Sequence, residues 1–89
     1  MTLAQQERRT LLDVARASIH HGLLHGRALP VTPGDYAPAL QATAATFATL
    51  QIDGALRGCI GTLEAHRPLV SDVAANAWAA AFRDSRFPP

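Results

Sequence analysis

The sequence predicts one small α+β domain in which a helix, a loop, a β-hairpin and a second helix follow one another. Apolar residues recur at three- to four-residue steps toward both ends of the chain, and an Asp-Gly pair separates two strand-like runs between them. The 89 residues leave room for a single domain. A hydrophobic share of 48% against 17% charged residues is typical of a globular chain and not of a disordered one.

The first expected element is an amphipathic helix near the N-terminus. The apolar residues that we expect to face the core follow helical spacing and are Leu12, Ala15, Ile19 and Leu23. Thr2 and Gln5 resemble a capping box at the start of this helix. Gly22 or Gly26 should end it, because glycine readily adopts the left-handed backbone that closes helices.

A loop is predicted for residues 28–40. Pro30, Pro33 and Pro38 lack the backbone N–H group that regular elements need, which leaves little room for a helix or strand. The side chains expected to pack this loop onto the core are Leu29, Val31 and Tyr36.

Residues 46–52 and 55–61 are predicted to form a hairpin, because Asp53-Gly54 suits a two-residue turn with positive φ. Such a turn places three pairs on one face: Ile52 with Ala55, Leu50 with Arg57, and Ala48 with Cys59. The opposite face would carry Phe47, Thr49, Leu56, Gly58 and Ile60. Since both faces are at least half apolar, we expect the sheet to be covered on both, which a hairpin with one helix cannot achieve.

A second helix should begin near Pro68, a residue that suits a first helical turn. Its expected buried stripe is rich in alanine and consists of Leu69, Val73, Ala74, Ala77, Trp78 and Ala81. The small alanines would let this helix approach the sheet closely, with Trp78 as its main anchor. Pro88 and Pro89 prevent its continuation.

Composition excludes several classes of function. A net charge of +1 is too balanced for binding phosphate backbones mainly by charge, so no nucleic acid is expected as a partner. All eight basic residues are arginines, which rules out Schiff-base and P-loop lysine chemistry. One cysteine excludes an intrachain disulfide, and the spacing of cysteine and histidine predicts neither a metal site nor a cofactor. No apolar run has the length of a signal peptide or a membrane span, so a cytoplasmic protein without membrane association is expected.

Three stretches of the sequence carry a resemblance to a known family: residues 47–50 (FATL), 56–61 (LRGCIG) and 80–89 (AAFRDSRFPP). With them the chain is similar to the AMMECR-type domain family, whose bacterial and archaeal members are called AmmeMemoRadiSam system protein A. The resemblance implies an α+β fold, an antiparallel sheet with flanking helices. It also implies that residues 1–89 are a single AMMECR-type domain truncated at the C-terminal end, because the family domain continues past the Pro-Pro pair with further strands.

The same resemblance implies an accessory role in the AmmeMemoRadiSam system. Genes of the family often accompany those of a Memo-like protein and a radical-SAM protein, so these two proteins are the expected partners. No biochemical activity is established for the family, and whether the chain is an enzyme stays open. The alternative is an enzyme or redox protein in which Arg57 activates Cys59 as a thiolate.

The hexapeptide around Cys59 contains the candidate site. Arg57 and Cys59 lie two residues apart in a strand and would project from one face, where the guanidinium group would favour the thiolate form. Gly58 and Gly61 are typical of a bulge, or of close approach by another backbone or a ligand, and are expected to contribute to binding. In the simpler interpretation, which we favour, Cys59 is a small buried apolar residue and the glycines admit the last helix.

Arg83, Asp84 and Arg86 form a second candidate cluster near the end of the last helix. Cations there are ordinarily partners of the helix dipole, and Asp84 can pair with one of them. The functional alternative has Asp84 reach Arg57, or has Arg83 and Arg86 join Arg57 in an anion-binding pocket, because guanidinium groups suit carboxylate and phosphate.

The histidines suggest two weaker candidates. His66 is the histidine nearest to Cys59 along the chain and would be its base, although a solvated position in the loop is the simpler interpretation. His21 and His25 have the i, i+4 spacing of half a metal site, yet histidines at a helix end also complement its dipole.

Overall fold

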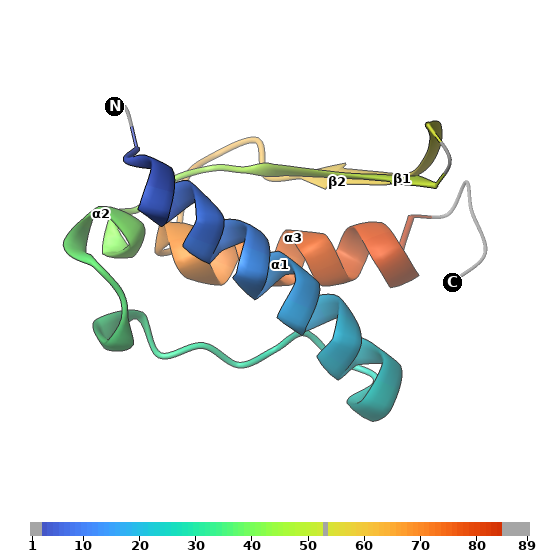
Figure 1. Ribbon diagram of the computed structural model, residues 1–89, viewed down its shortest axis with the longest axis horizontal. Coiled ribbons are helices and arrows are strands. Elements are labelled where there is room, and N and C mark those ends of the chain that lie inside the picture. The colour runs from blue at the N-terminus through green and yellow to red at the C-terminus, as the bar shows by residue number, and fades with distance from the viewer. Residues whose placement is uncertain (1–2, 53, 85–89) are drawn as a thin grey trace.

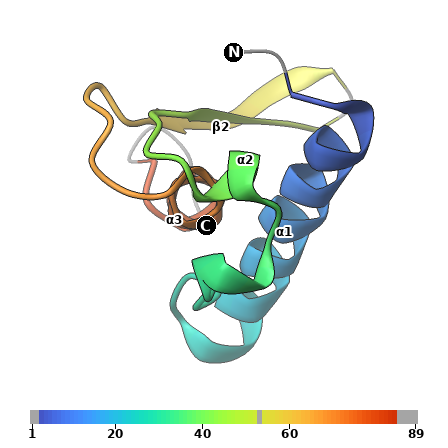
Figure 2. The same cartoon turned by 90° about the vertical axis from the view of Figure 1, so that its left-hand side faces the viewer.

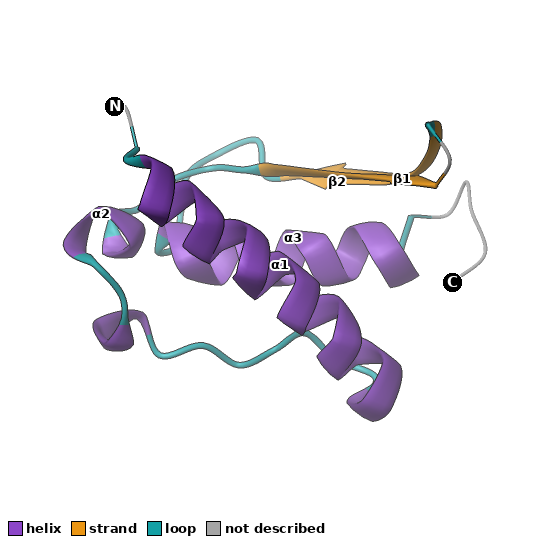
Figure 3. Ribbon diagram, in the orientation of Figure 1, coloured by secondary structure: helices purple, strands orange, loops and turns teal. Residues whose placement is uncertain are grey.

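The computed structural model describes residues 3–52 and 54–84, with the backbone alone at Ile52 and Arg57. Its elements in chain order are α1 (Gln5–His25), the 3-10 helix η1 (Pro33–Asp35), α2 (Pro38–Gln41), β1 (Phe47–Ile52), β2 (Ala55–Gly61) and α3 (Leu69–Phe82). The hairpin of β1 and β2 forms one layer, and α1 and α3 lie together on one side of it (Figures 1 and 2). This arrangement of helices and an antiparallel sheet confirms the predicted α+β class (Figure 3).

Helix α1 begins at Gln5, and its first turn differs from the predicted capping box. The backbone N–H of Ala4 donates to Glu7 Oε1 at 2.8 Å, so the acceptor is supplied by Glu7. Thr2, the predicted capping residue, lies outside the described residues. At the other end, Gly26 closes the helix with a φ of 72°. It is one of the two glycines at which the helix was predicted to end.

The predicted buried stripe of α1 is wrong. The buried residues of this helix are Val14, Ser18 and Gly22, whereas Leu12 is 56% exposed and Leu23 69% exposed. Helix α1 packs its Val14 face against α3 because small residues there allow close approach. The predicted helix is therefore confirmed, but the face that it buries against α3 is the one that carries Val14, Ser18 and Gly22.

Gly22 is the point of closest approach between α1 and α3. A Cβ atom at Gly22 would meet the side chains of Trp78 and Phe82. Trp78 therefore packs α3 against α1, whereas the sequence prediction had it anchor α3 to the sheet. Since α1 continues through Gly22 to His25, this glycine serves packing rather than termination.

The segment 28–40 contains more structure than the loop predicted for it. It includes η1 and most of α2, whose Leu40 is 1% exposed and joins the central apolar cluster with Val14 and Val70. Two of the three side chains predicted to pack this segment, Val31 and Tyr36, lie against that cluster. Prolines at the first turns of η1 and α2 explain why short helices form in a proline-rich segment.

The strand register differs from the prediction by one residue over most of the hairpin. Ile52 opposes Ala55 as expected, but a bulge next to Leu50 and Gln51 makes Leu50 oppose Gly58 and Thr49 oppose Cys59. The extra residue on β2 is Arg57, between the partners of Gln51 and Leu50. A slip of one residue moves every later side chain of β2 to the opposite face.

One face of the hairpin is covered by described residues and the other is open. Gly58 faces α3, and its neighbours on that face are Ala48, Leu50 and Ile60. The open face carries Phe47, Thr49, Cys59 and Gly61, and Phe47 is 67% exposed. The predicted cover on both faces is thus found on one face only within residues 3–52 and 54–84 (Figure 1).

Candidate functional site

Two of the three segments that carry the family resemblance meet at the outer edge of β2, at Cys59 and Asp84. The backbone N–H of Cys59 donates to Asp84 Oδ2 at 2.9 Å, across 25 residues of sequence. Asp84 is 7% exposed and follows the end of α3, where Arg83 closes the helix. The Asp84 carboxylate thus accepts the hydrogen bond that the backbone N–H of Cys59 would otherwise donate to a carbonyl group of a neighbouring strand.

The side chain of Cys59 lies on the open face of the hairpin and is partly exposed. Its Sγ atom is 3.5 Å from the hydroxyl of Thr49, its cross-strand partner. His66, the predicted base, lies in an exposed turn with its Nδ1 atom 3.1 Å from the carbonyl oxygen of Glu64. Thus the hydroxyl of Thr49 contacts the sulfur, whereas His66 contacts a carbonyl oxygen of its own turn.

Gly58 and Gly61 both permit close approach, each to a different neighbour. A Cβ atom at Gly58 would overlap the backbone carbonyl of Ala80, so α3 crosses directly against this glycine. At Gly61 the neighbour is the ring of Phe47, which lies over the glycine from the opposite strand. These contacts are within the chain itself, and they account for both glycines without a ligand.

The arginines predicted to form an anion-binding pocket are only partly described. The guanidinium group of Arg83 lies over the ring of Trp78, 5.0 Å from its centroid, in a cation–π contact. The side chain of Arg57 and the whole of Arg86 lie outside the described residues. The pocket formed by these arginines therefore stays a prediction.

The paired histidines of α1 lie close together, with ring centroids 4.4 Å apart. Burial, followed by the positive charges of His25 and Arg27, lowers the pKa of His21. A lowered pKa disfavours the charged form of His21 that would complement the helix dipole. Within residues 3–52 and 54–84, no group of three metal-ligating side chains comes together.

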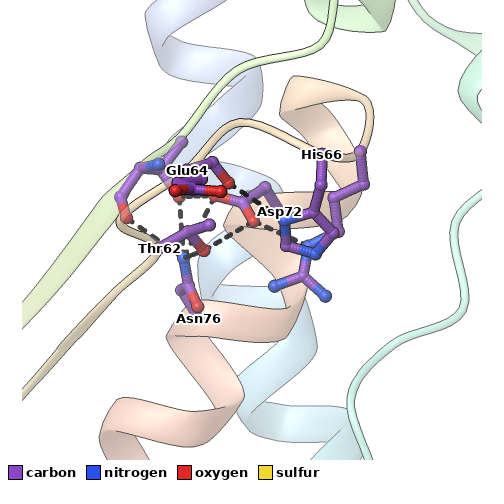
Figure 4. Close-up of polar contacts among 7 residues, drawn as sticks. Thr62, Glu64, His66, Asp72 and Asn76 are labelled. Atoms are coloured by element: carbon purple, nitrogen blue, oxygen red, sulfur yellow. Dashed lines mark hydrogen bonds and ion pairs between the residues drawn. The ribbon is translucent and has the colours of Figure 1, made fainter.

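A buried polar network centred on Asp72 lies at the end of α3 nearest the loop from β2 (Figure 4). Asp72 is fully buried, and its Oδ2 atom accepts from the backbone N–H of Thr46 at 2.8 Å and from the Thr46 hydroxyl at 2.6 Å. Its Oδ1 atom accepts from the Thr62 hydroxyl at 2.8 Å and from Arg67 Nε at 2.6 Å. One carboxylate thus holds the start of β1, the end of β2 and the following loop on α3.

Asn76 completes the network one helical turn later. Its Nδ2 atom donates to the carbonyl oxygen of Thr46 at 3.1 Å and to the hydroxyl of Thr62 at 2.9 Å. Neither Asp72 nor Asn76 was among the residues predicted from the sequence. Their signal was available, since two polar residues at i, i+4 within an alanine-rich apolar helix mark a buried polar pair.

The ionisation of Asp72 follows from this network. Burial tends to raise the pKa of its carboxyl group, but hydrogen bonds from Thr46, Arg67 and Thr62, together with the charge of Arg67, outweigh burial and lower it. Asp72 is therefore ionised at neutral pH. A fully partnered carboxylate of this kind stabilises one arrangement of the strands on α3, which is a structural task.

No helix within residues 3–52 and 54–84 has the length and apolar character needed to cross a membrane.

The sequence and the fold are similar to those of longer proteins. A family model described as AMMECR1 matches residues 12–89. A protein of Methanothermobacter thermautotrophicus is 38% identical over 98% of this chain, which corresponds to 45% of that protein. A protein of Thermotoga maritima is 52% identical over 48 residues. The crystal structure of an uncharacterised protein of Pyrococcus horikoshii superposes with a TM-score of 0.87 at 32% identity, covering 98% of this chain and 45% of that one.

Proposed function

Because the chain belongs to the AMMECR1 family, we propose that it acts as an accessory component of the AmmeMemoRadiSam system in the cytoplasm. In this role it binds a Memo-like protein or a radical-SAM protein. The binding surface, here called the signature surface, consists of the open hairpin face and the adjoining β2 edge: Phe47, Thr49, Cys59, Gly61 and Asp84. We expect Arg57 and Arg86 to contribute to binding on the sequence motif alone, because their side chains lie outside the described residues.

The observation that supports this proposal is the hydrogen bond from Cys59 to Asp84. It joins two of the three segments that resemble the family, the strand β2 and the residue that follows the end of α3. The signature surface includes Phe47, a large apolar side chain that is 67% exposed. Exposed aromatic side chains are typical of protein-binding surfaces.

Pull-down with purified Memo-like and radical-SAM proteins tests the proposal. Phe47→Ala, Arg57→Ala and Arg86→Ala should each weaken binding by roughly tenfold or more, as expected for residues at the centre of an interface. Arg9→Ala is the matched control, because Arg9 is exposed on α1, away from the hairpin. Cys59→Ser should bind as the unchanged chain does. Unchanged binding by the three surface variants would contradict the proposal.

Cysteine chemistry is the second candidate function. It is favoured by the partial exposure of Cys59 and by the hydroxyl of Thr49, which lies 3.5 Å from its sulfur and would donate to it if the cysteine were a thiolate. The alkylation rate of Cys59, followed against pH with and without denaturant, distinguishes the two functions because the chain has one cysteine. A native rate above the denatured rate at neutral pH would support an activated thiolate. A native rate well below it would support a structural cysteine within the signature surface.

A further inference from the structure

The backbone groups of Cys59 and Gly61 lie at the outer edge of β2 and point away from β1. The Thr62 N–H donates to the carbonyl of Thr46 at 2.9 Å, so the backbone of Thr62 points toward β1. This direction alternates along an antiparallel ladder, so the backbone of Gly61 and, two residues earlier, that of Cys59 point outward. The bond from the Cys59 N–H to Asp84 Oδ2 agrees with this direction.

An outer edge of this kind can pair with another strand. Its amide and carbonyl groups form a template for strand addition, and native proteins prevent such pairing by placing charged side chains at the edge. The strand itself favours pairing, because residues 58–61 (GCIG) carry no charge. The open hairpin face beside the edge adds Phe47, which is 67% exposed. A second copy of the chain would therefore find both backbone groups and apolar surface here.

The carboxylate of Asp84 occupies this edge. It accepts from the Cys59 N–H at 2.9 Å, and within the described part of the chain no other hydrogen bond reaches the outward backbone groups of Cys59 and Gly61. A carboxylate has no donor, so it binds the amide without offering a partner to the carbonyl group of an incoming strand. That carbonyl group would instead meet a negative charge at the position where it needs a donor.

The fold holds Asp84 in this position. Asp84 is 7% exposed, so neighbouring atoms restrict its side chain. Gly58 lies against the carbonyl of Ala80, which fixes the last turn of α3 over β2. The N–H of Arg83 then bonds to the carbonyl of Ala79 at 2.7 Å and ends the helix, and the next residue is Asp84. The contact between α3 and β2 thus also brings the carboxylate to the edge.

From these observations we propose that Asp84 is an edge guard, a residue whose carboxylate prevents the β2 edges of two copies of the chain from pairing. In an antiparallel pairing, the outward groups of Cys59 and Gly61 in one copy would face those in the other. Both Asp84 carboxylates would have to leave, and each would lose a charge-assisted hydrogen bond and a compensated position for its charge. The guard acts at the edge of β2 and not at that of β1, and it does not depend on the accessory role.

Hydrogen exchange followed against protein concentration tests the proposal, and sedimentation measures the number of copies. The Gly61 amide is the reporter, because it points outward and lies two residues from the amide that Asp84 binds. In the unchanged chain, its exchange rate should stay constant between roughly 10 µM and 1 mM. In Asp84→Ala the rate should fall by roughly tenfold or more over that range, while the sedimentation coefficient rises to that of a dimer or a larger assembly.

Two controls separate loss of the guard from loss of stability. Ser18→Ala removes a buried hydroxyl between α1 and α3 and leaves the β2 edge unchanged, so its Gly61 exchange should not depend on concentration. The amides of Phe47 and Thr49 point outward from β1 and report association through the other edge of the hairpin. They should respond to concentration equally in the unchanged chain and in Asp84→Ala.

Asp84→Asn provides the test if Asp84→Ala does not fold. Its carboxamide oxygen can still accept from Cys59, whereas its NH₂ group can donate to an incoming carbonyl group and no charge opposes pairing. Protection of the Gly61 amide that increases with concentration is therefore expected in this variant too.

Three results would overturn the proposal. The first is a Gly61 amide that exchanges at one rate at all concentrations in the folded Asp84 variants. The second is the same concentration-dependent protection of Gly61 in the unchanged chain, since the carboxylate would then not prevent pairing. The third is equal protection in Ser18→Ala, which would attribute the association to lost stability.

Discussion

Gly58 of β2 lies directly against the backbone carbonyl of Ala80 on α3, so closely that a methyl group on Gly58 would overlap the carbonyl oxygen. This contact sets the distance between the sheet and its central helix. The contact depends on the strand bulge, because the extra residue at Arg57 turns Gly58 toward α3 and Cys59 toward the open face.

Gly58→Ala should destabilise the chain by about 2–3 kcal/mol, because α3 must move away from β2 and lose packing along its length. The midpoint of urea unfolding measures this change. Gly34→Ala is the control, since Gly34 has open space around its Cα and no positive φ. Equal stability of the two variants would show that α3 does not pass over Gly58 as described.

Asp84→Ala should separate the two segments of the signature surface. The amide of Cys59 then loses the acceptor 2.9 Å away, and we expect its hydrogen exchange to accelerate. The free energy of unfolding should fall by about 1–3 kcal/mol, because the hydrogen bond involves a charged acceptor. Asp13→Ala, on an exposed part of α1, is the control and should leave both measurements unchanged. An unaltered Cys59 amide in Asp84→Ala would contradict the contact.

Ser18 links α1, α3 and the following loop through one buried hydroxyl. Its Oγ atom donates to the carbonyl of Ala74 at 2.7 Å and accepts from the backbone N–H of Leu29 at 3.0 Å. Ser18→Ala leaves both backbone groups without this partner, so the expected loss is about 1–3 kcal/mol. Ser71→Ala, at a half-buried position of α3, should cost little by comparison. Thermal unfolding of the two variants under one buffer condition provides the comparison.

Asp72 makes stability depend on acid pH. Its pKa in the folded chain lies below its ordinary value of 3.8, so the unfolded state binds the proton more readily. The stabilisation is fully present above about pH 4 and is lost as the pH falls through the folded pKa. The free energy of unfolding should therefore decrease below that pH, as measured by urea titrations at successive pH values.

Asp72→Asn identifies the residue responsible for this dependence. At neutral pH the variant should be less stable by about 2–4 kcal/mol, because Arg67 and the surrounding donors lose their charged acceptor. Below about pH 4 the difference from the unchanged chain should shrink, since Asp72 is itself becoming protonated there. A difference that stays constant from neutral to acid pH would contradict the ionised state assigned to Asp72.

Several elements were predictable because their cause is local. The helical periods, the glycine that closes α1 and the turn between the strands depend on residues close together in the sequence. The resemblance to the AMMECR-type family also came from short segments, such as residues 56–61. For the candidate site, the sequence identified Cys59 and Asp84 individually.

The tertiary structure decided which surfaces face one another. Helix α1 carries apolar residues on more than one face, and only its contact with α3 determines that Val14 is buried while Leu12 stays exposed. The bulge at Arg57 arises where β2 must place Gly58 beneath Ala80, a constraint from a helix that comes later in the chain. Asp72 is buried because Thr46, Thr62 and Arg67 converge on it from separate segments. Local sequence sets backbone preferences, whereas contacts between distant segments depend on packing of the whole domain, and these contacts joined Cys59 to Asp84.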